Sequence, residues 1–254
     1  MSGDVRTAYA RSGAAWRRGP ERVYARLAAA ILTAAALDLT GARVLDAGAG
    51  TGVLGAQARR RGAATVVAVD LAGAMLPRPP WPAAVADMTC LPFRGRSFDL
   101  AAAAFSLSHV DDQGRAVREL HRVAPRLIIG GFAPGWTHPA KDAVDAVLRR
   151  FGFELPEWYR RVKEETEPRA ADPGRLTELA EAAGFRDTGV AVRDVDTGLS
   201  SAVDLAGWRL GMAHAAPFVR NLSPEDRARL RRQAEEAVAG MPPLVITVQA
   251  FTAT

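Results

Sequence analysis

The segment "VLDAGAGTGVLG" at residues 44–55 restricts the fold more than any other part of the sequence. A short apolar run, a glycine-rich turn and the start of a helix follow one another directly, which is typical of a strand, a ligand-binding loop and a helix. Counted from Gly50, the glycines form G-x-G-x-x-G; counted from Gly48, they form D-x-G-x-G-x-G behind Asp46. The first register predicts hydride transfer with a dinucleotide, and the second predicts a different nucleoside cofactor.

Short β-rich apolar runs alternate with amphipathic stretches along the chain. The candidate strands are residues 43–47, 65–70, 83–87, 98–105, 125–132, 189–195 and 244–251. The alternation predicts an α/β fold with a seven-stranded, mainly parallel sheet flanked by helices. Capping residues support two of the helices: Asp172 begins one that Gly184 ends, and Ser223 begins another that ends near Gly240.

We expect a single domain with four parts. These are an N-terminal helical cap at 1–40, a cofactor-binding core at 41–132, and two long helical connections at 133–172 and 196–243. Segments that follow the carboxyl ends of strands overhang the ligand crevice of open α/β sheets, so the connections are candidate lid and substrate elements. An ordinary helical insertion that packs on its own core is the alternative.

The composition favours a soluble cytoplasmic protein that binds neither nucleic acid nor a membrane. Of 33 Lys and Arg residues only two are lysine, and the net charge is +5. The basic residues are interleaved with acidic ones, as in "RLRRQAEEA", which is typical of solvated helix surfaces. Cys90 is the single cysteine, so no intramolecular disulfide can form. No apolar run approaches the roughly 20 residues of a membrane-spanning helix, and the N-terminus lacks a secretory signal.

Three acidic residues lie at the ends of successive predicted strands. Asp46 would lie where a pyrophosphate has to bind in the dinucleotide register, and two anions at short range repel each other. An acid there suits a ligand with a positive centre. Asp70 follows the glycines by roughly 20 residues, which is the offset of an acid that binds ribose hydroxyls. With Asp87 at the third strand end, the set indicates a ligand site, although each acid alone could be a helix cap or turn residue.

These motifs, in this order, resemble the class I S-adenosylmethionine-dependent methyltransferases, particularly the small-molecule group that includes the ubiquinone and menaquinone C-methyltransferases. The matching segments are "VLDAGAGTG", "VVAVDLAGAML", "AVADMTCLPFRGRSFDLAAAAFSLSHVDD" and "VRELHRVAPRLIIGGF". The resemblance covers about residues 40–133, with a weaker match in "YARSGAAWRRGPERVYARLAAAIL". It implies a Rossmann-like methyltransferase fold with S-adenosylmethionine as cofactor. "PRPPWP" at 77–82 departs from the family pattern and is expected to shorten the helix after the second strand.

The resemblance also implies which residues bind the cofactor. Those expected around the methionine part are Asp46, Ala47, Gly48, Gly50, Phe105 and Ser106. Those expected around the adenosine part are Asp70, Leu71, Asp87 and Met88. Asp70 would hold the ribose and Asp87 the adenine amino group. Tyr9 and Trp16 would close over the cofactor from the N-terminal helix, with a plain core position as the alternative for Trp16.

The candidate catalytic residue is His109 in "SLSHVDD", just beyond the fourth predicted strand. Its neutral form could accept a proton from an oxygen or carbon acid, and a capping or packing role is the alternative. Residues of the long connections that could face the acceptor are Trp136, Trp208, Met212 and His214. Core packing is the alternative for the last three, and no metal site is expected.

The sequence is also compatible with other functions. Tyr159 and Lys163 form the Y-x-x-x-K pattern of short-chain dehydrogenases, but no strand precedes them as that family requires. The fold could instead serve a non-methylating cyclisation or a purely structural cofactor site. The net charge alone suggests RNA, yet "SLSH" stands where adenine N-methyltransferases carry an Asn/Asp-Pro-Pro-aromatic motif. The favoured acceptor is a small, partly apolar metabolite such as a secondary-metabolite intermediate, methylated on O, N or C; a homodimer is left open.

Overall fold

The computed structural model describes residues 3–77 and 82–254 and contains one seven-stranded sheet among them. The strands are β1 (Arg43–Ala47), β2 (Thr65–Asp70), β3 (Ala83–Val85), β4 (Leu100–Ala104), β5 (Leu127–Phe132), β6 (Thr188–Asp196) and β7 (Val245–Ala253). Their order is β3-β2-β1-β4-β5-β7-β6. The pairs from β3 to β5 are parallel, whereas β7 runs antiparallel to both β5 and β6. The predicted fold class is therefore confirmed.

The bounds of β1 and β2 are as predicted, whereas each of the other five strands differs by one or two residues at an end, and for β3 and β4 the reason is local. β4 begins at Leu100 because the side chain of Asp99 turns away to accept hydrogen bonds from the backbone and guanidinium of Arg43. It ends before Phe105, whose φ of +57° is incompatible with an extended strand. β3 ends at Val85, and Asp87 forms only an isolated bridge with Cys90.

The helices alternate with the strands as expected. They are α1 (Gly3–Arg18), α2 (Pro20–Ala35), α3 (Val53–Arg60), α4 (Gln113–Val123), α5 (Pro139–Arg150), α6 (Glu157–Arg161), α7 (Glu167–Ala171), α8 (Pro173–Ala183), α9 (Ala202–Leu210), α10 (Ala216–Asn221) and α11 (Pro224–Ala237), with a 3-10 turn η1 (Leu107–His109) and a π-helical turn η2 (Val162–Thr166). The predicted caps are present: Asp172 accepts from the amide of Gly174, Gly184 is left-handed after α8, and Ser223 accepts from Asp226.

The proline-rich segment predicted to shorten a helix includes residues 78–81, which lie outside the described part of the chain. Residues 71–77, which lead into it, form turns. No described helix has the length and apolar character needed to span a membrane.

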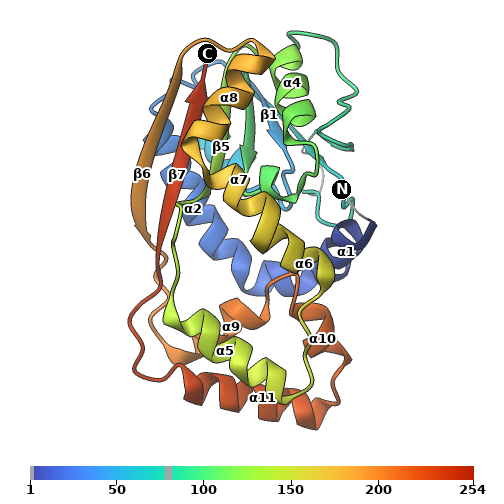
Figure 1. The fold of residues 1–254 in the computed structure, drawn as a ribbon, viewed down its shortest axis with the longest axis vertical. Helices are drawn as coiled ribbons and strands as arrows, with labels where there is room; N and C mark the ends of the chain where they lie inside the picture. Colours follow the sequence, from blue (N-terminus) through green and yellow to red (C-terminus); the bar gives the residue numbers. More distant parts are fainter. Residues whose placement is uncertain (1–2, 78–81) are drawn as a thin grey trace.

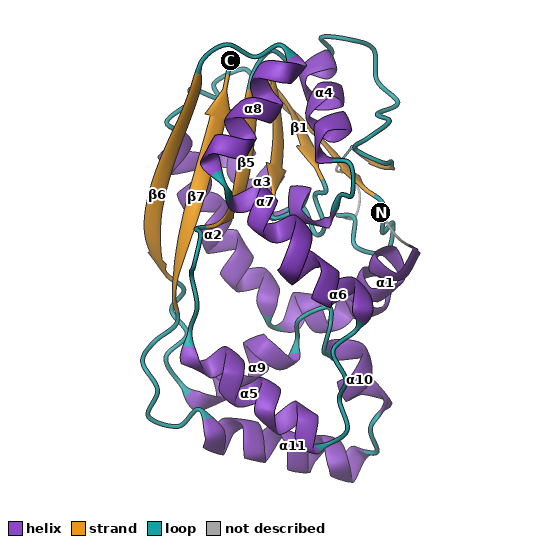
Figure 2. Ribbon diagram, in the orientation of Figure 1, coloured by secondary structure: helices purple, strands orange, loops and turns teal. Residues whose placement is uncertain are grey.

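Helices cover both faces of the sheet and a second layer lies beyond one end of it (Figures 1 and 2). α2 and α3 pack on one face, and α4 and α8 pack on the other. The closeness of α2 is visible at Gly130, where an added Cβ would lie 2.6 Å from Cδ1 of Ile31. The two long connections, which follow β5 and β6, gather α5, α9, α10 and α11 into a helical layer on the side toward which the parallel strands point. That side therefore holds the ligand crevice.

Candidate active site

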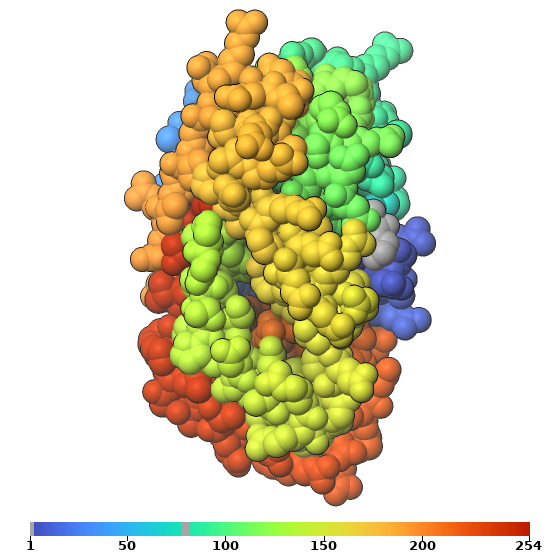
Figure 3. All heavy atoms as spheres, viewed as in Figure 1, coloured from blue at the N-terminus to red at the C-terminus, as the bar shows by residue number. Residues whose placement is uncertain are grey.

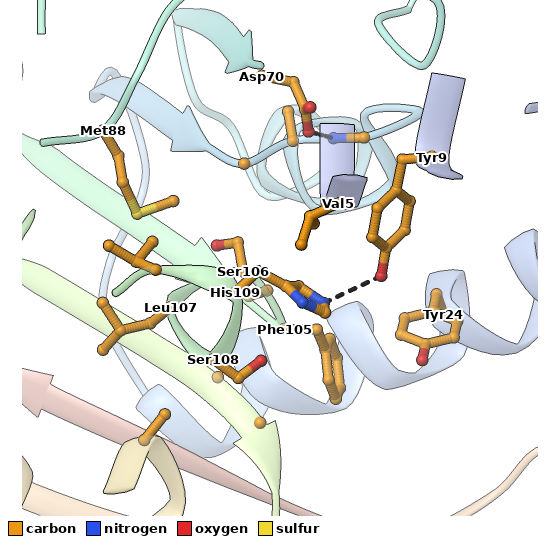
Figure 4. Close-up of a pocket in the computed structure, with 18 of the residues that line it drawn as sticks. Val5, Tyr9, Tyr24, Asp70, Met88, Phe105, Ser106, Leu107, Ser108 and His109 are labelled. Carbon is orange, nitrogen blue, oxygen red and sulfur yellow. Dashed lines mark hydrogen bonds between the residues drawn. The ribbon is translucent and has the colours of Figure 1, made fainter. Parts of the chain in front are cut away.

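A cavity lies at the carboxyl ends of β1, β2, β4 and β5, between the sheet, α1 and the α6–α7 segment (Figure 4). It gathers most of the residues that the sequence indicated. Those that line it are Tyr9, Trp16, Asp46, Gly48, Gly50, Asp70, Leu71, Asp87, Met88, Phe105, Ser106, His109 and Met212. Parts of the chain as distant as α1 and the loop before α10 thus meet at one site.

The glycine loop lets the backbone approach the cavity without side chains in the way. Gly48 has a φ of +72°, and a Cβ there would lie 2.3 Å from the Cβ of Ser106. No other residue fits this position without moving the neighbouring strand end. Gly55 serves packing instead, since its Cβ would lie 2.8 Å from Cγ1 of Val66 on β2. The glycine register that starts at Gly48 is therefore the one that shapes the site.

Asp46 is a buried carboxylate without a cationic partner. Only 2% of the residue is exposed, and its Oδ2 accepts a hydrogen bond of 2.9 Å from the amide of Gly55. It makes no ion pair with any described residue. Burial, with a smaller effect from Asp70, raises its pKa to about 7 despite the hydrogen bond. A ligand with a positive centre beside Asp46 would supply the missing charge, so the site fits a cationic cofactor.

The carboxylate of Asp70 is held in place by the loop that it faces. Its Oδ2 accepts from the amide of Gly50 at 2.8 Å, and its Oδ1 accepts from the amide of Ala72 at 2.8 Å (Figure 4). Burial raises its pKa, which the two amide hydrogen bonds partly offset. Each oxygen keeps a lone pair for a further donor, as binding of a ribose diol requires. Asp87 is oriented similarly, because its Oδ1 accepts from the amide and hydroxyl of Thr89.

The turn after β4 carries backbone strain beside the cavity. Phe105 has a φ of +57°, and strain of this kind clusters at ligand sites. Ser106 secures the turn, since its hydroxyl donates to the carbonyl of Ala47 at 2.8 Å. Ala47 is fully buried and lies behind the cavity wall. Ala47 therefore contributes to the site by positioning Ser106 through its backbone carbonyl.

Tyr9 and His109 form a hydrogen-bonded pair over the cavity. The Tyr9 hydroxyl lies 2.9 Å from Nε2 of His109, and the rings meet edge to face (Figure 4). Burial and the charge of Lys163 lower the pKa of His109 to about 4, so the imidazole is neutral at pH 7. Burial raises the pKa of Tyr9, which keeps its hydroxyl protonated. Nδ1 of His109 is buried and has no hydrogen-bond partner among the described residues, so the accessible edge of the pair is the Tyr9 hydroxyl.

Two aromatic residues that the sequence did not single out, Tyr24 and Phe132, form another wall of the cavity together with Phe105. Tyr24 on α2 lies 5.0 Å from Phe105 between ring centroids, and Phe105 lies 5.0 Å from Phe132 at the end of β5. Tyr24 occupies the apolar stripe of α2 and Phe132 ends an apolar strand, so both resemble core residues in the sequence. Phe132 ends a strand and Tyr24 faces the strand ends, and this placement becomes visible only in the folded sheet.

Three residues that were candidates for the acceptor side lie outside this cavity. Trp136 stacks on Phe132 and donates from Nε1 to the carbonyl of Val245 at 3.0 Å. Trp208 is 3% exposed and packs in the core of the helical layer. His214 stacks on Tyr159 with ring centroids 4.0 Å apart.

The Y-x-x-x-K residues line the cavity but are engaged with other groups. The hydroxyl of Tyr159 accepts from Nη1 of Arg209 at 3.4 Å, and Lys163 pairs with Glu167. Within 3–77 and 82–254 no group of three or more His, Cys, Asp or Glu side chains is placed to hold a metal ion.

Comparisons with known proteins agree with this geometry. Residues 45–126 match the methyltransferase domain family. A malonyl-[acyl-carrier protein] O-methyltransferase of Halorhodospira halophila is 42% identical over 113 residues, which are 40% of this chain and 38% of that protein. A demethylmenaquinone methyltransferase of Streptomyces griseus is 37% identical over 41% of this chain and 49% of its own length. The chain thus matches less than half of the length of these two relatives.

Solved structures match over nearly the whole chain. A protein described as a methyltransferase of an antibiotic biosynthesis pathway from Anabaena variabilis has a TM-score of 0.60 at 16% identity and covers 91% of this chain and 99% of its own. A protein described as an S-adenosylmethionine-dependent methyltransferase from Thermotoga maritima has a TM-score of 0.55 at 17% identity and covers 98% of both chains. At such identities these matches establish the fold. Residues 45–126 thus carry a methyltransferase domain, and the chain as a whole has the fold of the methyltransferases that it resembles.

Proposed function

We propose that the protein transfers the methyl group of S-adenosylmethionine to oxygen, nitrogen or carbon of a small, partly apolar metabolite. The observation that carries the proposal is the Tyr9–His109 pair, which lies in the same cavity as the buried Asp46 and the partly buried Asp70. A cofactor site and a proton-handling pair thus share one cavity. The proposal covers all three acceptor atoms, because the relatives are named for different acceptors.

The chain offers a matching group for each part of the cofactor. Asp46 would neutralise the positive charge of the methionine part, and Asp70 would accept hydrogen bonds from the ribose hydroxyls. Asp87 and the backbone of Met88 would hold the adenine. S-adenosylmethionine supplies an electrophilic methyl group on a sulfonium cation when bound. The residues of this chain have to align an acceptor with that group and exclude water.

Tyr9 would handle the proton of an acceptor that loses one. Because Nε2 of His109 is occupied by the Tyr9 hydroxyl and Nδ1 is buried, the acceptor reaches the imidazole only through Tyr9. The acceptor proton would move to the Tyr9 oxygen as the Tyr9 proton moves to Nε2. A base with a pKa of about 4 suffices, since the acceptor proton becomes strongly acidic as the new bond to carbon forms.

Aromatic side chains would shield the reaction from water. Trp16, Tyr24 and Phe105 line the cavity around the Tyr9–His109 pair, and Tyr9 meets Trp16 edge to face at 6.0 Å. α1 carries both Tyr9 and Trp16, which line the cavity, so this helix would act as an N-terminal cap over it. The dry surroundings also account for the shifted pKa values of Tyr9 and His109.

The test is incubation with methyl-labelled S-adenosylmethionine and a pool of small metabolites. We expect S-adenosylhomocysteine to accumulate and label to appear in a small organic product. Asp70→Ala is the matched variant: it should lose cofactor binding and label transfer together. Cofactor binding without either product would refute methyl transfer. A thermal shift with a nicotinamide dinucleotide, and none with S-adenosylhomocysteine, would refute the cofactor as well.

A further inference from the structure

The two lysines of the chain converge on one pair of aromatic rings. The sequence holds 33 Lys and Arg residues, of which only Lys141 and Lys163 are lysine. Phe132 and Trp136 are stacked with ring centroids 5.1 Å apart and 15° between their planes. Nζ of Lys141 lies 5.0 Å from the Trp136 ring, and Nζ of Lys163 lies 5.9 Å from the Phe132 ring. Each lysine therefore lies over one ring of the same stack.

The stack links the cavity to the outside of the molecule. Phe132 and Lys163 line the cavity itself, whereas Trp136 and Lys141 belong to the segment that follows β5. The hydrogen bond from Trp136 to the carbonyl of Val245 fixes this segment against β7. The surface is hollowed between the segment after β5 and the α6–α7 region, coloured lime and gold in Figure 3. Lys141 lies on α5, at the start of the helix that borders this hollow.

The partly buried charges near the stack leave one positive charge without an ionic partner among the described residues. Lys163 pairs with Glu167, and Arg209 pairs through two hydrogen bonds of 2.8 and 2.6 Å with Asp145. Lys141 is half-buried and makes no ion pair with any residue of the described chain. Its remaining acidic neighbour, Asp142, is exposed to solvent and screened. Three cations, Lys141, Lys163 and Arg209, therefore face two partly buried anions, Glu167 and Asp145.

The field at this end of the cavity disfavours further positive charge. Burial lowers the pKa of Lys141, and the charges of Lys163 and Arg209 lower it further. Burial lowers the pKa of His214 well below its usual value, with Arg209, Lys163 and Lys141 adding to the effect. An anion would relieve the cost of burying these groups. A ligand with one negative charge would balance the net positive charge of these groups.

We propose that Lys141, assisted by Lys163, binds a carboxylate of the acceptor, and that the apolar body of the acceptor lies against Phe105 and Phe132. This inference rests on the proposed function, because it names the acceptor class of the same cavity. A phosphate dianion would overcompensate the single unpaired charge. Phosphate sites commonly use the bidentate guanidinium of arginine. The guanidinium of nearby Arg209 already donates from Nε and Nη2 to Asp145 and from Nη1 to Tyr159.

The experiment compares two probes of equal shape, 2-naphthoate and the neutral 2-naphthamide, by calorimetric titration of the full chain without cofactor. The wild-type protein should bind the carboxylate about tenfold more tightly than the amide, as expected for a hydrogen bond to a charged group. Lys141→Met should reduce the ratio to about one, and Lys141→Arg should restore a preference. Arg149→Met, an exposed charge on the same helix, is the matched control and should keep the wild-type ratio.

Equal affinity of the wild type for both probes would overturn the inference, as would a preference that survives in Lys141→Met. Lys141→Gln provides a second neutral variant should the methionine variant fail to fold, with thermal unfolding measured on each. Because no cofactor or turnover enters these titrations, their outcome is independent of the labelled-methyl assay. A carboxylate preference without methyl transfer would refute the proposed function alone, and methyl transfer without the preference would refute this inference alone.

Discussion

We expect the buried carboxylate of Asp46 to make cofactor affinity depend on pH. Because burial raises its pKa to about 7, Asp46 is ionised above that pH and becomes neutral as the pH falls through it. The cation that the site is suited to requires the ionised form. We therefore expect S-adenosylhomocysteine, whose homocysteine part keeps the ammonium group, to bind more weakly in mild acid. Asp46→Asn, which keeps the shape but not the charge, should abolish this dependence.

The size of the effect follows from the pKa. A group with a pKa near 7 is ionised to about 9% at pH 6 and about 91% at pH 8, so the dissociation constant should change about tenfold, or about 1.4 kcal/mol. His109, with its pKa of about 4, stays neutral throughout this interval and does not contribute. The pKa of Asp70 is also raised, so protonation of Asp70 would likewise weaken binding as the pH falls. The asparagine variant at position 46 separates the two acids.

The assay is calorimetric titration with S-adenosylhomocysteine at pH 6, 7 and 8. Asp46→Asn should bind weakly and almost equally at all three values. Asp99→Asn is the control, because hydrogen bonds from Arg43 lower the pKa of Asp99 to about 2, so its removal should leave the pH dependence intact. A wild-type affinity that is flat from pH 6 to pH 8 would refute the reasoning. So would a tenfold change that persists in Asp46→Asn.

Three further predictions concern catalysis and stability. Tyr9→Phe should lower kcat about 100-fold for an acceptor that loses a proton, with S-adenosylhomocysteine affinity unchanged by calorimetry; an equal loss of affinity would assign the tyrosine to cofactor binding instead. Gly48→Ala should cost about 2–4 kcal/mol in urea unfolding, because the added Cβ meets a strand end at 2.3 Å in a left-handed backbone conformation; a cost below about 0.5 kcal/mol would contradict the steric argument. Arg209→Met should cost about 3–5 kcal/mol by leaving Asp145 buried and unpaired, and the double variant with Asp145→Leu should recover most of it; additive losses would show that the pair is not coupled.

The parallel part of the fold could be predicted from the sequence because its signals are local. Each strand from β1 to β5 is a short apolar run, and the glycines behind β1 permit only a tight turn. The antiparallel position of β7 between β5 and β6 could not be predicted in this way. Its pairing joins Leu127 to Ala253 and Thr188 to the same residue, across long separations in sequence. No local pattern of apolar residues specifies such a neighbour.

The residues of the candidate site also differ in how well the sequence locates them. Asp46, Asp70 and Asp87 could be located because a residue at the end of a parallel strand lies at the ligand edge whatever the rest of the chain does. The side chains of the long connections could not, since the direction of a helical residue depends on how the whole helix is rotated against its neighbours. Met212 faces the cavity while Trp208 of the adjoining helix packs in the core.

The order of the strands separates the two halves of the site in a way that bears on how such a protein can change. The cofactor-side groups come from β1 to β4, whereas both long connections leave from β5 and β6 and one returns through β7. Segments exchanged at residues 133–172 or 196–243 would therefore change residues that are proposed to face the acceptor, without touching the strand ends that carry Asp46 and Asp70. The β5-β7-β6 edge thus carries both connections, and grafting connections between relatives at these boundaries would test whether they determine the choice of acceptor.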